Sequence, residues 1–411
     1  MEKLQINNHI RLIELFAGVG SQAMALRDMG ADFESWITCE WWTQPNGSYK
    51  AIHCENDTTN YSTDMDRSEV IEFLFKKSIS ADGKKPMTFE QIKRKSEKWQ
   101  RETYNNIIAT KNLVNIQEAH GSDLNIVDVD SNTYIMTYSF PCQDLSVAGK
   151  MRGMDKGSNT RSSMLWEVER LLDECENLPQ VLLMENVPQV MGAKNMANFE
   201  TWQQYLESKG YKNYTQIINA VDHGVAQSRK RAFMVSVLGE KDYKFPEPYD
   251  LEKCMDDYLD EVVDEKFYCS SEQAEQLIIE RRYKSIKNKG EKITRPAYVG
   301  YCDQGTGRHQ HNEVFATNGV ARCLTASDYK RPMRILTNGK EAIRRITPKE
   351  AWRLMDFSDE DYEKAAAVNS QTALYAQAGN SIVRQVLVDI FSEMIPQERR
   401  QTNDGERKKG S

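Results

Sequence analysis

The chain has 411 residues, which exceeds the usual size of one domain and predicts one large and one small domain. With 39% hydrophobic, 28% charged and 9% aromatic residues, it fits a globular enzyme and excludes disordered and collagen-like chains. No apolar run approaches the roughly 18 residues of a transmembrane helix, which excludes a membrane-spanning protein. The net charge of −7 argues against indiscriminate binding of polyanions, so any nucleic-acid surface must be local.

The eight cysteines are scattered without a C-x-x-C pair, and the histidines do not cluster. We therefore expect neither a disulfide framework nor a metal site. The N-terminus lacks the basic, apolar and small-residue segments of a secretory signal, which favours a cytoplasmic protein. Two basic stretches, 84–101 and 281–295, could face nucleic acid, but a solvated charged surface explains each of them at least as well.

The chain opens with alternating strand-like and helical segments. The run IRLIELF at 10–16 predicts a strand, AGVGS a tight turn, and the spacing of 23–29 a helix that stops at Gly30. Further strands are predicted at 33–42, 133–140 and 178–187, and further helices at 162–177 and 197–210. This alternation indicates an α/β doubly wound sheet, in which functional groups gather at the carboxyl ends of the strands.

Shifts in composition suggest where the domains lie. Residues 57–110 are polar, lysine-rich and helical in pattern, and we interpret them as an insertion in a first domain that spans 1–243. After the run RAFMVSV, a proline-bounded acidic stretch begins a smaller domain, which we place at 244–342. The sequence thus predicts that the first domain is interrupted twice.

Regular helix resumes at Thr347, which with Pro348 and Glu350 matches an N-cap, a first-turn proline and a reciprocal capping glutamate. We assign 343–396 to the end of the first domain, and we expect the tail at 397–411 to be disordered.

The first turn could bind a nucleotide-like ligand. Gly18, Gly20 and Ala23 fit the G-x-G-x-x-(G/A) spacing after a strand, and Glu40 ends the next strand about twenty residues later. Glycines let the backbone approach a ligand, and the carboxylate can accept both ribose hydroxyls of an adenosine. A nicotinamide cofactor and S-adenosylmethionine both satisfy this description. Phe16 could face the adenine or belong to the core, and Asp123 could receive the adenine amino group or serve a turn.

A second set of reactive residues follows two other strands. Cys142 in SFPCQDLS lies between a proline and a polar loop, a suitable position for an exposed nucleophile, although a cysteine is more often an inert buried residue. Glu185 in MENV is a carboxylate in an otherwise apolar run. In QSRKR, Arg229 and Arg231 share one face of a strand and suit carbonyl or phosphate contacts. This combination suggests thiol attack on an electron-poor ring, assisted by proton donation.

The segments ELFAGVG, CEWW, SFPCQDLS, MENV, QSRKR and QAGNSIV occur in one order and together resemble the DNA cytosine-5 methyltransferase family, bacterial or phage type. The resemblance covers roughly 10–56, 118–240 and 343–392. It implies a Rossmann-like S-adenosylmethionine-dependent domain with a smaller, variable target-recognition domain.

The resemblance implies covalent catalysis on a cytosine. Cys142 would attack C6 of the base, Glu185 would hold and protonate N3, and Arg231 would donate to O2, with Arg229 nearby. C5 would then accept the methyl group of S-adenosylmethionine. The base must first be extruded from the duplex.

The same matching implies binding residues. The cofactor pocket would be lined by Phe16, Gly18, Gly20, Glu40, Trp41, Asp123, Leu124, Pro141, Asn380 and Ser381, so the C-terminal helix should pack back onto the first strands. The loop 143–163 would close over the extruded base, and DNA contacts would come from Gln143, Ser146, Arg161 and Gln227. Arg308, in a flexible basic loop, could read guanine in the major groove, and an exposed structural loop is equally compatible.

We therefore predict a monomeric, site-specific enzyme that acts on double-stranded DNA in a bacterial or phage-infected cell, with a cognate restriction endonuclease as an optional partner. Two alternatives remain: a methyltransferase of the same fold that acts on tRNA, and a catalytically silent DNA-binding module. The glycine turn alone would also permit a nicotinamide oxidoreductase, but that reading leaves SFPCQDLS and MENV unexplained.

Overall fold

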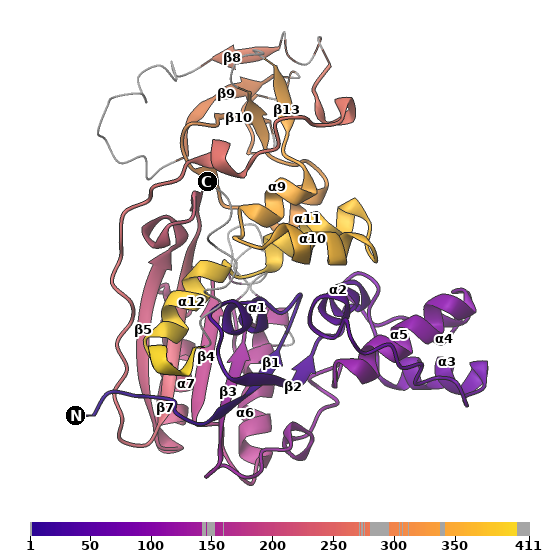
Figure 1. Cartoon of the computed structure of the whole chain (residues 1–411), viewed down its shortest axis with the longest axis vertical. Coiled ribbons are helices and arrows are strands. Elements are labelled where there is room, and N and C mark those ends of the chain that lie inside the picture. The colour runs from indigo at the N-terminus through magenta and orange to yellow at the C-terminus, as the bar shows by residue number, and fades with distance from the viewer. Residues whose placement is uncertain are drawn as a thin grey trace. The chain divides into compact units, whose positions relative to one another are not determined.

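The chain forms two compact units. The computed structural model describes residues 2–141, 145, 153–158, 160–270, 272, 274, 276–279, 296–303, 305, 307–310, 312–337 and 342–400. The first unit contains the chain up to 217, residues 231–246 and the chain from 387 on, and the second contains 218–230 and 247–386 (Figure 1).

The first unit is built on a sheet that has six strands in the described residues, in the order β2-β1-β3-β4-β7-β5. The strands are β1 (His9–Leu15), β2 (Phe33–Cys39), β3 (Asn132–Tyr138), β4 (Val181–Asn186), β5 (Tyr211–Asn219) and β7 (Lys230–Leu238). Strands β2, β1, β3 and β4 are parallel, and β7 is antiparallel to β4. Because β2 and β3 flank β1 on opposite sides, the strand order reverses at β1, where such sheets bind ligands. The predicted α/β doubly wound fold is confirmed.

Helices accompany this sheet: α1 (Ser21–Asp28), α2 (Thr43–His53), α6 (Leu165–Glu174), α7 (Met196–Ser208) and α12 (Arg384–Ser392). Apolar residues of β1, β3, β4, α6 and α7 form one buried core, in which Trp202 of α7 donates from Nε1 to the hydroxyl of Tyr138 at 3.0 Å. Helix α12 and the residues after it contact this unit, since the Tyr243 hydroxyl donates to the carbonyl of Ile390 and the amide of Ile6 donates to that of Met394. Packing of the C-terminal helix onto the first strands stays a prediction.

The insertion between β2 and β3 carries α3 (Arg67–Lys76), α4 (Phe89–Lys93) and α5 (Glu97–Ala109), which confirms its predicted helical content. Figure 1 shows these helices beyond β2, at the edge of the sheet. They enclose a separate core of Val70, Ile71, Leu74, Ile79, Met87, Ile92, Ile107 and Val114. The insertion is therefore a packed subdomain with its own apolar centre.

The second unit contains a sheet of five strands in the described residues, in the order β13-β12-β10-β9-β8. The strands are β8 (Leu277–Ile279), β9 (Tyr298–Cys302), β10 (Glu313–Ala316), β12 (Arg334–Leu336) and β13 (Ile343–Arg345). A separate pair joins β6 (Gln227–Ser228) to β11 (Ala321–Arg322). The helices of this unit are α9 (Pro348–Arg353), α10 (Asp359–Ala366) and α11 (Gln371–Asn380).

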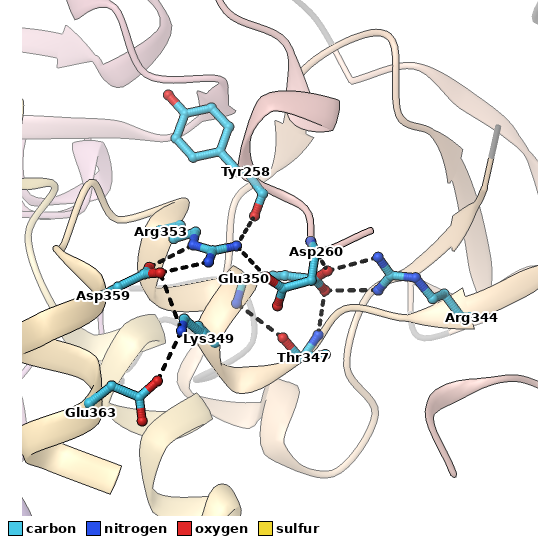
Figure 2. Close-up of polar contacts among 9 residues, drawn as sticks. All are labelled: Tyr258, Asp260, Arg344, Thr347, Lys349, Glu350, Arg353, Asp359 and Glu363. Carbon is cyan, nitrogen blue, oxygen red and sulfur yellow. Dashed lines mark hydrogen bonds and ion pairs between the residues drawn. The ribbon is translucent and has the colours of Figure 1, made fainter. Parts of the chain in front are cut away.

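Charged side chains join α9 to the segments around it (Figure 2). Glu350 is fully buried and accepts from both terminal nitrogens of Arg344, at 2.7 and 2.8 Å. The same carboxylate accepts the amide of Thr347, completing the predicted capping box, and the amide of Asp260. Arg353 pairs with Asp260 and Asp359. These contacts fix the start of α9 against β13 and the segment at 260.

The compact units do not follow the predicted boundaries, because residues 343–386 belong to the second unit together with most of 244–342. The division into a catalytic and a target-recognition domain stays a prediction. The expected disorder of the tail is wrong for 397–400, because Gln397–Arg399 form a short 3-10 helix and Arg400 donates to the carbonyls of Ser392 and Ile395. Residues 401–411 lie outside the described chain. In the described residues, no helix is both long and apolar enough to span a membrane.

Candidate active site

The turn after β1 is shaped by residues with positive φ. Phe16, Gly18 and Gly20 have φ values of 60°, 56° and 81°. A Cβ atom on Gly20 would lie 2.6 Å from the ring of Tyr49 and would also overlap His53 of α2, so this position requires glycine. A Cβ atom on Gly18 would meet no atom within 4 Å, so its backbone is open to an approaching ligand.

Glu40 connects this turn to the end of β2. Its carboxylate accepts the amide of Gly18 at 3.0 Å and the amide of Trp42 at 2.8 Å. Burial raises the pKa of Glu40 to about 7, although both hydrogen bonds favour the charged form. A carboxylate has about four acceptor positions, so two remain for the hydroxyls of a ligand. The structure thus brings together Gly18 and Glu40, as the spacing predicted.

Asn112 holds the backbone of Glu40 and is not among the residues predicted from the sequence. Its side-chain oxygen accepts the Glu40 amide and its side-chain nitrogen donates to the Glu40 carbonyl, both at 2.9 Å. Asn112 is separated from Glu40 by the whole insertion, and no motif marks it. Only folding of the insertion brings the two residues together.

Glu185 and Arg231 form an ion pair at the ends of adjacent strands. Arg231 Nε lies 3.0 Å from Glu185 Oε1, and the two side chains are 16% and 9% exposed. In the antiparallel β4–β7 register Glu185 opposes Phe233 and Asn186 opposes Ala232, so Arg231, the second residue of β7, lies just past the end of β4. A largely buried ion pair adds little net stability because both charges lose hydration.

The segment that leads to Cys142 is fixed beside Glu185. Asn186 donates from its side-chain amide to the carbonyl of Phe140 at 3.0 Å, and the Ser162 hydroxyl donates to the carbonyl of Pro141 at 2.7 Å. Strand β3 pairs with β4 up to Tyr138 and Met184, so both chain segments leave the sheet at the same edge. Ser162 had no recognisable signal in the sequence, whereas Asn186 lies within the quoted MENV motif.

Several predicted residues fall outside the described residues: Cys142, Gln143 and Ser146, with residues 144, 147–152 and 159 of the loop 143–163. Arg161 begins a 3-10 helix, but its side chain is also outside the described part. Their roles stay predictions.

Three further cofactor candidates lie in the first unit. Trp41 packs against the core of the insertion. Asp123 is exposed, and its carboxylate accepts the amide of His120 at 2.9 Å. Leu124 is fully buried, and its carbonyl accepts Trp36 Nε1 at 3.1 Å. Each has a structural role already, and ligand contact by these residues stays a prediction.

The structure places Arg229 and Gln227 inside the second unit. Arg229 donates to the carbonyls of Leu324, Gly379 and Ser381. Gln227 is fully buried, donates to the Leu354 carbonyl and accepts the Leu324 amide. The side-chain amide of Gln227 thus serves the fold, and its DNA contact stays a prediction.

The remaining candidates of the second unit differ in exposure. Asn380 is exposed at the end of α11, and the buried Ser381 donates to the Gln377 carbonyl at 2.7 Å. Arg308 has a half-exposed side chain, pairs with Glu313 at 3.0 Å and stacks on the ring of Tyr298 at 4.2 Å. A cofactor role for the first two and a DNA role for Arg308 stay predictions.

In the described part of the chain, no three His, Cys, Asp or Glu side chains are grouped so that they could hold a metal ion. The polar groups gathered at this edge of the sheet are the glycine turn with Glu40 and the Glu185–Arg231 pair beside the segment that leads to Cys142.

Comparison with known proteins identifies relatives of this arrangement. The sequence profile described as C-5 cytosine-specific DNA methylase matches residues 86–396. The type II methyltransferase M2.ScrFI of Lactococcus lactis subsp. cremoris is 34% identical over 392 residues, which cover 94% of this chain and 99% of that protein. The orphan methyltransferase M.SssI of Spiroplasma monobiae is 30% identical over 393 residues, which cover 94% and 97%.

Among solved structures, the Entamoeba histolytica methyltransferase EhMeth has a TM-score of 0.60 at 15% identity, over 94% of this chain and 98% of that one. The methyltransferase Dnmt2 of S. pombe has a TM-score of 0.56 at 16% identity, over 94% and 98%. At such identities, these two likenesses concern the fold alone. The profile match and the 34% identity over nearly the whole chain show that this protein belongs to the C-5 cytosine-specific DNA methylase family and is a DNA cytosine-5 methyltransferase.

Proposed function

We propose that this methyltransferase uses Cys142 as a nucleophile toward C6 of a cytosine extruded from double-stranded DNA, while Glu185 and Arg231 hold the pyrimidine ring. The observation that carries the proposal is the Glu185–Arg231 pair, 3.0 Å apart, at the sheet edge where the segment entering Cys142 is fixed by Asn186. An acid and a guanidinium beside a thiol match the N3 and O2 atoms of a cytosine.

The roles of the three side chains follow from the electronic demand of the ring. Glu185 would place a proton on N3 and Arg231 would donate to O2, which together draw electrons from the ring and make C6 open to the Cys142 thiolate. The new S–C6 bond makes C5 electron-rich. After C5 has been substituted and has lost its proton, cleavage of the S–C6 bond regenerates Cys142 and the aromatic ring.

Gly18 and Glu40 would hold the cofactor, S-adenosylmethionine. The fit rests on the open space beyond the Gly18 backbone and on the two acceptor positions that remain on the Glu40 carboxylate. These positions suit the two ribose hydroxyls of an adenosine. When bound, S-adenosylmethionine supplies an electrophilic methyl carbon on a sulfonium. Phe16, Gly20, Trp41, Asp123, Leu124, Pro141, Asn380 and Ser381 would complete the pocket.

The test combines substrate choice with the nucleophile. Wild-type protein with methyl-labelled S-adenosylmethionine should label duplex DNA and not tRNA. Cys142→Ser should abolish labelling while retaining cofactor binding. Duplex DNA with 5-fluorocytosine at the target should form a denaturation-resistant adduct, because fluorine cannot leave C5 as a proton does.

Glu185→Gln should lower kcat by about 10²- to 10⁴-fold, the usual contribution of a positioned acid. Glu240→Gln, on a 96% exposed side chain, is the matched control and should leave kcat unchanged. Labelling of tRNA alone would favour the tRNA enzyme, and DNA binding without labelling would favour a silent module. Residual methylation by Cys142→Ser would contradict the nucleophile. A monomeric state, a cytoplasmic location and a cognate restriction endonuclease stay predictions.

A further inference from the structure

The insertion carries a groove whose role the catalytic site does not explain. We call it the basic groove and define it by its lining residues Ala81, Asp82, Lys85, Pro86, Met87, Gln91, Arg94 and Lys95. Its volume is about 460 Å³. One wall is the loop from Ser80 to Met87, and the other is the end of α4 with the residues that follow it.

The first wall is held rigidly. The Ser80 hydroxyl donates to the carbonyl of Lys85 at 2.7 Å, and Asp82 accepts the backbone amide of Lys84 at 2.9 Å. Trp42 donates from Nε1 to the carbonyl of Ala81 at 3.0 Å. These hydrogen bonds fix the backbone of the loop, so the Cα atom of Lys85 has a defined position.

The second wall is held equally well by two residues of the insertion. Gln100 is fully buried and donates to the carbonyls of Ile92 and Lys95, at 2.8 and 3.1 Å. Arg67 donates to Gln100 Oε1 and to the carbonyl of Lys95, at 2.9 and 3.2 Å. These bonds use only the backbone of 92–95, so they do not engage the side chains of Arg94 and Lys95, which line the groove. The Lys95 ammonium lies 5.1 Å from the centre of the Trp99 ring.

The side chains that line the groove carry a net positive charge, because Lys85, Arg94 and Lys95 face the single carboxylate of Asp82. Residues 84–95 contain five basic residues and one acidic residue. In the described part of the chain, Lys85, Arg94 and Lys95 have no ion-pair partner, and the one carboxylate that lines the groove, Asp82, is occupied with backbone amides.

Other basic residues of the insertion behave differently. Lys76 pairs with Glu72 at 2.8 Å and Lys98 with Glu102 at 3.7 Å, each across one helical turn. Three cations that have no ion-pair partner in the described residues thus line one groove, and such a cluster favours the binding of an anion.

The groove is also on the relevant side of the sheet. Its first wall is bonded to Trp42, two residues after Glu40, which follows the carboxyl end of β2. Strands β2 and β4 run in the same direction in this sheet, so Glu185 lies at the same edge. The loop that forms the first wall thus lies at the edge where the proposed chemistry takes place.

We propose that the basic groove binds the phosphodiester backbone of the substrate duplex outside the recognised sequence, with Lys85, Arg94 and Lys95 as phosphate contacts. The proposal rests on the activity toward DNA. Phosphate contacts of this kind position the protein and carry no sequence information. They also make affinity depend on salt, because each neutralised phosphate releases condensed counterions.

The experiment measures binding of the full-length protein to DNA as a function of salt concentration. The triple variant K85Q/R94Q/K95Q is compared with wild type on a long duplex and on a short duplex that ends close to the target. On the long duplex, each lost contact should reduce the slope of log K against log salt by about 0.9, and affinity should fall by about tenfold or more at about 0.1 M salt. On the short duplex the two proteins should bind alike.

Two control variants distinguish the effect of positive charge in the basic groove from the effect of the protein's total charge. K76Q/K77Q/K98Q removes three positive charges from the same insertion outside the groove and should bind both duplexes as wild type does. K85R/R94K/K95R retains the groove's charge and should keep most of the affinity and slope. Equal thermal midpoints of unfolding will show that the variants fold.

An unchanged slope and affinity of K85Q/R94Q/K95Q on the long duplex would overturn the proposal. That result would count against it even if the groove bound free anions such as inorganic phosphate. Equal losses in K76Q/K77Q/K98Q would overturn it as well. Because binding is measured without turnover, failure of this proposal is distinguishable from failure of the catalytic one, which is read from methylation by wild type.

Discussion

Arg229 donates from Nη2 to the carbonyl of Gly379 at 2.9 Å, although 150 residues separate them. The same nitrogen donates to Ser381 at 2.7 Å, and Nη1 donates to Leu324 at 2.7 Å. One buried guanidinium therefore joins three distant segments and fixes the turn that contains Asn380. This placement gives the first arginine of QSRKR a structural task in addition to any role in catalysis.

Arg229→Gln should lower the free energy of unfolding by about 3 kcal/mol or more, because hydrogen bonds from a charged donor contribute about 1.5–3 kcal/mol and the freed carbonyls stay buried. Denaturant titration measures the change, and exposed Lys241→Gln is the control, with no change expected. A variant of unchanged stability that has lost kcat would instead indicate a catalytic role for Arg229.

Gly379→Ala should destabilise the protein, because a Cβ atom at 379 would overlap the backbone of Thr325 and Ala326, which cannot move like a flexible side chain. Overpacking of this kind costs about 1–3 kcal/mol and occasionally more. Gly47 within α2 is the matched control, since its Cβ would meet Asn106 at an ordinary 3.7 Å. Gly47→Ala should stabilise by up to about 1 kcal/mol in the same denaturation measurement. Equal effects of the two substitutions would contradict the packing argument.

Glu350→Gln should be strongly destabilising, since it leaves the guanidinium of Arg344 buried without its counter-charge (Figure 2). Removing one partner of a buried pair typically costs about 3–5 kcal/mol. Glu363→Gln removes an exposed partner of Lys349 in the same network and should change stability by at most about 1 kcal/mol. Thermal or denaturant unfolding of the two variants side by side checks the difference, and equal losses would refute it.

Glu14 should make stability depend on pH. Burial raises its pKa from 4.5 to about 7, although bonds from Tyr49 and Ala23 oppose the shift. The folded state therefore favours the neutral acid. The stabilisation of the folded state by protonated Glu14 is fully present below pH 4.5 and is lost as the pH rises through 7.

Over that window the wild-type free energy of unfolding should fall relative to Glu14→Gln, by at most about 1.4 kcal/mol per pH unit. Urea titrations at several pH values measure the free energy of unfolding of both proteins. Other titrating groups, such as Glu40, contribute equally to both and cancel in the difference between wild type and Glu14→Gln. A difference that stays constant with pH would show that Glu14 is ionised throughout.

Local patterns in the sequence determined the framework of this protein. The apolar runs that predict β1, β3 and β4, the glycine turn, and the cap formed by Thr347 and Glu350 are recorded in neighbouring residues, because periodicity and capping act over one or two turns of chain. The pairing of Glu40 with the Gly18 amide also follows from a fixed spacing after parallel strands.

Only the tertiary structure decided which polar side chains serve the fold. Gln227 and Arg229 look like DNA or ring contacts in sequence, yet both bind backbone groups that are more than 90 residues away. Asn112 and the separate core of the insertion are likewise invisible along the chain. Hydrogen bonds and apolar burial between distant segments depend on how the chain is brought together, and a single sequence does not record that arrangement.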